Sequence, residues 1–260
     1  MEDAGADEIK FKKLRRFNLI MGFFHFIQAA IMLAIANYST KMVFVTSFYD
    51  GMLGGFPPTA DGVVVEPLFS IPLGPMVAVF LLMSAIAHLS VSTFGYKWYV
   101  KNLKMNMNKA RWFEYALSSS FMLVVIAWLC GMFDLVSLIL LFSLNACMNL
   151  FGYMMELHNQ TTKKTDWTSF IFGCFAGLIP WIALFMYFTG VRSGSPPDFV
   201  YGIMISIAFF FNVFAINMVL QYKKVGKWKD YLYGEKVYII LSLVAKSALA
   251  WQVFSGTMVA

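Results

Sequence analysis

Charged residues are scarce in this sequence: Asp, Glu, Lys and Arg make up 13% of its 260 residues, while 60% are hydrophobic. A soluble domain carries about twice that share of charge, so the composition excludes a soluble domain and indicates an integral membrane protein.

Cysteine is also rare. The three cysteines, Cys130, Cys147 and Cys174, lie in apolar segments without CxxC spacing. This predicts packing roles rather than disulfides, and we expect no metal site.

Long hydrophobic runs, by contrast, fill most of the chain. A helix needs about 20 predominantly apolar residues to cross a bilayer, and seven segments meet that length. They cover about residues 17–36, 72–94, 110–131, 134–155, 167–189, 199–221 and 236–258. The predicted fold class is therefore an all-α membrane protein, with residues 1–260 forming a single seven-transmembrane helix bundle.

Lysine and arginine are unevenly distributed between the two sides of these spans. Apart from Lys246, every basic residue except Lys41 and Arg192 falls in segments that share a side with residues 1–16. Because basic loops remain in the cytoplasm, we expect a multi-pass cell-membrane protein with a cytoplasmic N-terminus and an extracellular C-terminus. The net charge of +6 is then explained by topology and contact with membrane lipid, and nucleic acid is not expected as a partner.

Three segments outside the spans have their own composition. Residues 1–16 are polar and predict a cytoplasmic arm, and residues 222–235 predict a basic cytoplasmic loop. The run 17–37 is long enough to span and no small-residue cleavage pattern follows it, so we expect it to remain as the first helix. Residues 38–71 hold two β-rich runs around Gly and Pro turns, which predicts an external β-hairpin.

One lysine, Lys246, interrupts the last apolar span. A cation at the centre of a membrane helix costs about 2.5–3.5 kcal/mol on insertion scales, so a partner and a function are expected. The predicted partner is Glu114, the one carboxylate well inside a span. Three others lie at span ends, namely Asp134, Glu156 and Glu235.

The Lys246–Glu114 pair is compatible with several functions. A lysine amine in an apolar pocket can form a Schiff base with an aldehyde, and a nearby carboxylate favours its charged form. The pair could equally fix helix packing or bind a transported ion. Glu114 is also shallower than Lys246 when both are counted from their span ends, so pairing requires the third helix to begin earlier, near Met105.

Five sequence segments, together with the seven spans, carry a family resemblance. The segments are RWFEYALSSS, SLVAKSALAWQVFSG, GLIPWI, FVYGI and GKWKDYLYGE. They resemble heliorhodopsin, a microbial-rhodopsin-like retinal protein with inverted topology, and the similarity covers nearly the whole chain. The resemblance implies an N-terminus inside, a long first external loop and a homodimer in which the external hairpin is a candidate contact.

The resemblance also implies roles for individual residues. Lys246 matches the retinal-bearing lysine and Glu114 its counterion, so all-trans retinal held as a protonated Schiff base is the implied cofactor. Further implied neighbours of the cofactor are Ser242, Ser118 and, by position, the ring-pocket residues Met148, Gly152, Trp181, Phe210 and Trp251. A polar cavity on the cytoplasmic side is implied for His25, Gln28, Ser84, His88, Asn108, Tyr115 and Asn145.

Helical spacing gives the two intramembrane histidines a polar companion each. His25 and Gln28 are three residues apart, and Ser84 and His88 are four apart, so each pair shares a helix face. A histidine in such a place is either a satisfied packing residue or a proton carrier near physiological pH. We therefore hypothesise that the two histidines hold a proton released from the Schiff base.

Together these features predict a light-sensing photoreceptor with a slow photocycle and no ion pumping, and no enzyme activity. A pump needs a carboxylate on each side of the Schiff base, and only Glu114 lies clearly inside a predicted span. Light-driven or light-gated proton transport is the first alternative. A retinal-free receptor or transporter, retinal storage and a lipid-facing scaffold remain further alternatives, and a cytoplasmic signalling partner is expected but not identified by any residue.

Overall fold

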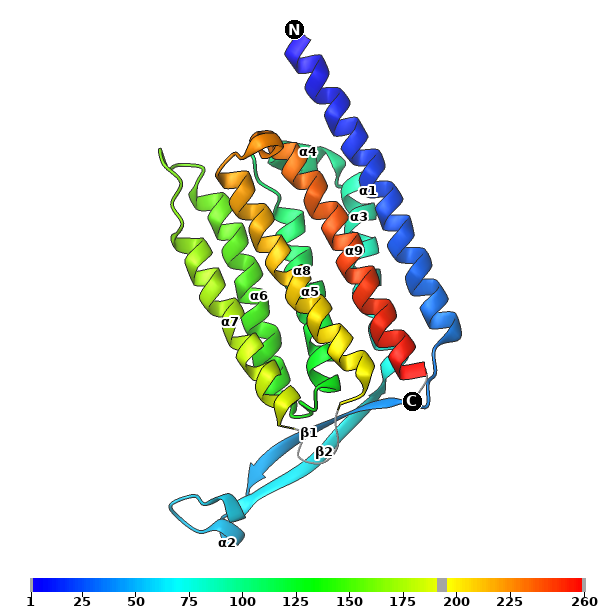
Figure 1. Cartoon of the computed structure of the whole chain (residues 1–260), viewed down its shortest axis with the longest axis vertical. Helices are drawn as coiled ribbons and strands as arrows, with labels where there is room; N and C mark the ends of the chain where they lie inside the picture. The colour runs from blue at the N-terminus through cyan, green and yellow to red at the C-terminus, as the bar shows by residue number, and fades with distance from the viewer. Residues whose placement is uncertain (1, 191–195, 259–260) are drawn as a thin grey trace.

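The computed structural model describes residues 2–190 and 196–258, and its long helices stand side by side as one bundle (Figure 1). Arg192, one of the two basic residues predicted on the external side, lies outside the described residues. Within them, seven helices are long and apolar enough to cross a membrane: α1 (Glu2–Ile35), α3 (Leu73–Ser92), α5 (Lys109–Leu129), α6 (Leu135–His158), α7 (Thr168–Thr189), α8 (Asp198–Tyr222) and α9 (Tyr231–Met258). The predicted seven-helix fold is confirmed.

Several helix boundaries differ from the prediction. The predicted arm over residues 1–16 is helical and continuous with the first span, because α1 already begins at Glu2. The last helix begins at Tyr231, and a 3-10 turn occupies Gly226–Lys229, so the loop predicted over residues 222–235 is shorter than expected.

The predicted early start of the third span near Met105 is wrong. The helix α5 begins at Lys109, and the Asn108 side chain caps it by accepting a hydrogen bond from the Arg111 amide. Just before it, Asn106 has a φ of 51°, a left-handed conformation that interrupts a helix. The preceding residues form a separate short helix, α4 (Tyr96–Leu103).

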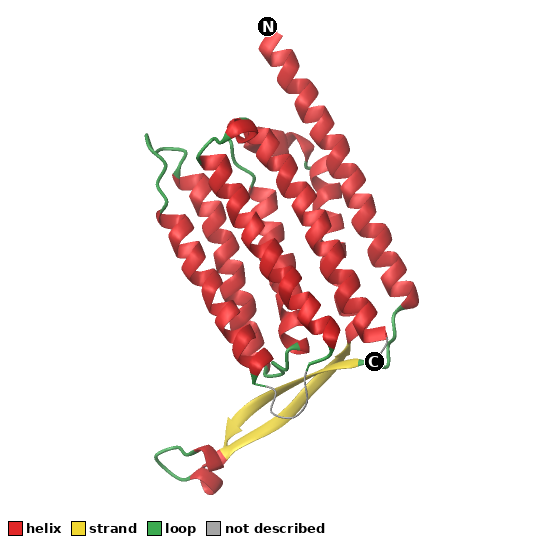
Figure 2. Ribbon diagram, viewed as in Figure 1, coloured by secondary structure: helices red, strands yellow, loops and turns green. Residues whose placement is uncertain are grey.

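The predicted hairpin is confirmed as two antiparallel strands, β1 (Lys41–Tyr49) and β2 (Val63–Pro72), shown in yellow in Figure 2. A short helix, α2 (Gly51–Gly54), and a 3-10 turn, Ala60–Gly62, form its tip. The first strand is fixed to the bundle by the Trp128 indole, which donates to the Val43 carbonyl at 2.9 Å. It is also fixed by the Val45 amide, which donates to the Phe133 carbonyl at 3.0 Å.

The bundle therefore has two different ends, which we call the α4 end and the hairpin end (Figure 1). Between Lys246 and the hairpin end, the core is a large apolar cluster that includes Phe80, Ile126, Leu249 and Phe254. Towards the α4 end, the core also contains buried polar side chains and an aromatic cluster, beside a smaller apolar cluster. The outer surface is apolar, with Phe175 69% and Ile205 72% exposed, as expected of lipid-facing helices.

Candidate functional site

Lys246 and Glu114 form an ion pair in the middle of the bundle. Their side chains are only 5% and 8% exposed. The Lys246 ammonium also donates to the Ser84 hydroxyl at 2.7 Å, and that hydroxyl donates to Glu114 Oε1 at 2.7 Å. The three residues come from α9, α5 and α3, so three helices meet at one closed triangle of polar atoms. The structure thus brings together the pair that was predicted from sequence.

The pair forms although its members lie at different depths along their helices. From Lys109 to Glu114 the rise is about 8 Å, whereas from Tyr231 to Lys246 it is about 22 Å. Part of the difference arises because α9 starts further out than α5. Asn108, at the start of α5, donates from Nδ2 to Glu235 Oε2 at 2.6 Å, so the start of α5 is level with a residue already inside α9. The lysine side chain reduces the remainder, since helical side chains lean towards the start of their own helix.

Two histidines lie beside this pair on the side towards the α4 end. The rings of His25 and His88 stack with centroids 5.7 Å apart and planes 13° apart. His88 Nδ1 donates to Asn18 Oδ1 at 2.7 Å, which leaves Nε2 as the nitrogen with a free lone pair. His25 is fully buried, and neither of its ring nitrogens has a hydrogen-bond partner within the described residues.

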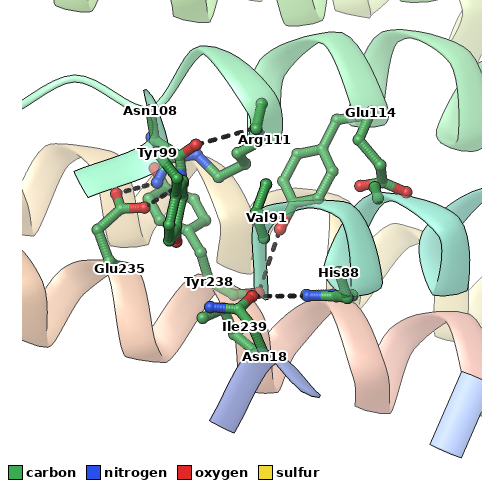
Figure 3. A pocket seen from close by; sticks show the side chains of 13 residues that line it. Asn18, His88, Val91, Tyr99, Asn108, Arg111, Glu114, Glu235, Tyr238 and Ile239 are labelled. Carbon is green, nitrogen blue, oxygen red and sulfur yellow. Dashed lines mark hydrogen bonds and ion pairs between the residues drawn. The ribbon is translucent and has the colours of Figure 1, made fainter. Parts of the chain in front are cut away.

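A polar cavity of about 40 Å³ extends from Glu114 towards the α4 end (Figure 3). It is large enough for water, because one buried water needs about 10–15 Å³ by this kind of measure. The polar residues that line it are Asn18, His88, Tyr99, Asn108, Arg111, Glu114, Tyr115, Glu235 and Tyr238. The cavity therefore joins Glu114 of the ion pair and His88 to a second charged group.

This second group consists of Arg111 between Glu156 and Glu235. One guanidinium nitrogen binds each carboxylate, and all three side chains are at most 4% exposed. The Asn108 backbone N–H donates to Glu156 Oε2 at 2.8 Å, so the residue that caps α5 also contacts α6. The Arg111 guanidinium lies over the rings of Trp112 and Tyr238, at 4.6 and 3.9 Å from their centroids.

Sequence reasoning missed this cluster and treated Glu114 as the one carboxylate clearly inside a span. Glu156 and Glu235 do lie near helix ends, but they are 2% and 0% exposed. They are buried because α4 and the first turn of α9 cover this end of the bundle (Figure 1). Arg111 itself was the available signal, since a buried guanidinium requires carboxylate partners.

The remaining predicted cavity residues fall in three places. Asn108 and Tyr115 line the cavity. Asn145 lies elsewhere, between α5 and α6, where its amide donates to the hydroxyls of Ser119 at 3.0 Å and Ser120 at 2.9 Å. His25, Ser84 and Gln28 are not among the lining residues. The Gln28 side-chain oxygen accepts a hydrogen bond from the Trp251 indole at 3.0 Å.

The predicted cofactor neighbours also divide into groups. Ser118 lies one turn after Glu114, and Ser242 lies one turn before Lys246. Both are buried, at 0% and 1% exposure. Trp251 is 37% exposed beside Gln28, so the structure does not place it in a buried wall.

The predicted ring-pocket residues of α6, α7 and α8 are only partly assembled. A Cβ at Gly177 would lie 2.7 Å from the Met148 sulfur, so Met148 packs directly on that glycine. A Cβ at Gly152 would lie 2.3 Å from the Trp112 ring, so Gly152 is needed for the close approach of that ring. Trp181 packs edge to face on Phe211, with centroids 5.5 Å apart, whereas Phe210 packs on the exposed Phe209.

A family model described as Heliorhodopsin matches residues 14–258. The match includes every helix and both strands of the hairpin, apart from the first turns of α1 and the last residues of the chain. No curated protein matches the chain.

Proposed function

The chain belongs to the heliorhodopsin family of retinal-binding, light-sensing rhodopsins, and on this basis we propose a photoreceptor with all-trans retinal on Lys246 and no ion pumping. The observation that carries the proposal is the buried triangle of Lys246, Glu114 and Ser84, in which Glu114 also borders the polar cavity that extends towards the α4 end. This family is a photoreceptor family and not an enzyme family.

The residues around Lys246 fit a retinal. The amine is buried beside a carboxylate, as an attached cationic group requires, and His25 offers two buried nitrogens without partners among the described residues. An apolar surface on α6, α7 and α8 is formed by Met148, Gly177, Trp181 and Phe211, and Met148 packs directly on the glycine. These residues would hold the ring, and Lys246 would hold the other end by a covalent bond.

When bound, retinal supplies light absorption and a double bond that isomerises, and the protein supplies the electrostatics. Glu114 neutralises the positive charge at the Lys246 nitrogen, and Ser84 fixes the carboxylate by donating to Oε1. A carboxylate this close to a buried cation stabilises the charged ground state of the chromophore. The protonation and the colour of the chromophore therefore depend on Glu114.

Replacing Glu114 with glutamine is expected to move the visible band to longer wavelength and to make its intensity pH-sensitive. The amide occupies the same volume but removes the negative charge that stabilises the cation at Lys246. Absorption spectra recorded across a pH series test this prediction, with the exposed Glu66→Gln variant as the control. An unchanged spectrum in Glu114→Gln would rule out Glu114 as the counterion.

The cavity histidines are placed to receive the proton that leaves the Lys246 nitrogen after illumination. His88 Nδ1 is held by Asn18, so Nε2 is free to accept a proton. His25 stacks on His88, so the two rings lie close enough for His25 to respond to a charge on His88. The proton stays within the protein in this scheme.

Changing both His25 and His88 to phenylalanine is expected to slow Schiff-base deprotonation by about 100-fold, the lower limit for loss of a positioned proton acceptor. Flash photolysis of the reconstituted protein measures this step. The third histidine of the chain provides the control, because His158 is exposed and pairs with Asp166. Unaltered kinetics in the double variant would eliminate the histidines as acceptors.

The absence of pumping is supported by the one-sided polar path. Between Lys246 and the hairpin end, the described residues include no buried carboxylate or basic side chain, and the core there is largely apolar. Proton transport is the second candidate function. It is favoured by Glu156 and Glu235, which extend the polar path to the α4 end. The sequence argument against pumping assumed that Glu114 was the one buried carboxylate, and these two residues contradict that assumption.

Voltage-clamped cells that contain the reconstituted protein are expected to show no photocurrent at any holding potential. The apolar core towards the hairpin end gives a proton no route across the bundle. The visible absorption of the same cells provides the control that protein and retinal are present. A steady or transient current whose sign follows the membrane voltage would establish transport instead.

The proposal includes an orientation and an assembly. The α4 end carries exposed lysines, among them Lys97, Lys101 and Lys223, and basic ends remain cytoplasmic. A cytoplasmic signalling partner would then meet this end, next to the Arg111 cluster. We also propose a homodimer, with the hairpin as a contact, because its tip exposes Met52 at 97% and Phe56 at 95%.

A further inference from the structure

We propose that Glu156 and Glu235 hold one proton between them, so that the Arg111 cluster is a second buried proton-binding site, separate from the Lys246–Glu114 pair. The site lies at the α4 end, where Arg111 bridges α6 and α9 from its position on α5. Figure 3 shows Glu235 and Arg111 at one end of the cavity, and Glu114 and His88 at the other.

The charge count requires the proton. Two carboxylates face one guanidinium, and within the described residues the other buried cation, Lys246, is already paired with Glu114. A net negative charge on side chains this deeply buried is strongly unfavourable, and binding one proton removes it.

The other titratable groups around the cluster do not supply a positive charge. They are phenols on three packed elements, Tyr99 of α4, Tyr222 of α8 and Tyr231 and Tyr238 of α9, with His88 of α3 across the cavity. Burial, and after it the Glu235 carboxylate, raises the pKa of the Tyr99 hydroxyl. A phenol with a raised pKa stays neutral, so Tyr99 leaves the charge of the cluster unchanged.

Each carboxyl group has an acceptor for the proton. The Tyr231 hydroxyl lies 3.3 Å from Glu156 Oε1, and a hydroxyl can accept as well as donate. Glu235 borders the cavity, which has room for an accepting water. Both carboxyl groups bind the same guanidinium, so each is in a similar electrostatic environment and either can hold the proton.

The cavity gives this site a connection to His88 and Glu114. A proton bound near Arg111 therefore changes the field at the α4 end without crossing the apolar core. Binding of the proton does not depend on retinal, so the proposal survives or fails independently of the light-sensor function.

Infrared spectroscopy of protein labelled with ¹³C at the glutamate side-chain carboxyl tests the proposal. In the dark at neutral pH, with or without retinal, we expect one labelled band from a protonated carboxylic acid, which shifts in D₂O. The band should be lost in Glu156→Gln and equally in Glu235→Gln, because either variant leaves one carboxylate for one guanidinium. The exposed Glu66→Gln variant should keep it.

Two results would overturn the proposal. One is a wild-type spectrum without the band, and the other is a band that survives in either Gln variant. Where a Gln variant does not fold, Glu156→Asp and Glu235→Asp keep both charges but remove the label at one position. A labelled band at full intensity in both Asp variants would then show that the proton resides elsewhere.

Discussion

Replacing Lys246 with alanine is expected to abolish the visible band that the wild-type protein forms with all-trans retinal. The amine is the nucleophile for the Schiff base, and it is the lysine held at 5% exposure beside a buried carboxylate. Without it, retinal has no covalent attachment and no cationic nitrogen for Glu114 to stabilise. The absorption spectrum of protein purified after expression with retinal measures the loss directly.

Two further variants separate attachment from folding. Lys246→Arg keeps a cation beside Glu114 but cannot form the Schiff base, so it should fold and show no band. Lys236→Ala removes an exposed lysine of the same helix and should keep the band. A visible band in Lys246→Ala would place the chromophore elsewhere, and no band in the wild type would leave Lys246 and Glu114 as a packing or transport pair.

The sequence alone was sufficient for the features that depend on composition and local pattern. Apolar length defined the seven helices, and Gly and Pro turns between β-rich runs defined the hairpin. The Lys246–Glu114 pair was also predictable, because a cation in mid-span is costly and needs a partner. None of these inferences required knowledge of how the helix ends pack.

The features that depend on how the helix ends pack were not predictable in this way. Glu156 and Glu235 look like ordinary polar residues at span ends, and their burial depends on how α4 and the first turn of α9 pack over that end of the bundle. The depth of Glu114 relative to Lys246 was also misjudged. The two residues meet because α9 starts early, at Tyr231, and not because α5 starts early. Likewise, the positions of Gln28 and Trp251 on the outside depend on how α1 packs against α9.

Replacing Arg111 with glutamine is expected to destabilise the protein by about 3–5 kcal/mol, the loss typical of removing one member of a buried ion pair. Two buried carboxylates would lose their shared cation, and the contacts of the guanidinium with Trp112 and Tyr238 would also be lost. Thermal inactivation in detergent, followed by loss of the visible band, measures the change. The exposed Arg16→Gln variant is the matched control.

The pH dependence of that loss distinguishes charge from packing. At low pH both carboxyl groups can bind protons and become neutral, so Arg111→Gln should lie close to the wild type. As the pH rises the groups must ionise without a cation, and the difference in stability should grow. The triple variant Arg111→Gln/Glu156→Gln/Glu235→Gln should recover most of the stability and lose the pH dependence, but not regain the ring contacts. If Arg111→Gln were equally destabilised at every pH and the triple variant gave no recovery, the guanidinium would act by packing alone, and the charge count that places a proton on Glu156 and Glu235 would lose its basis.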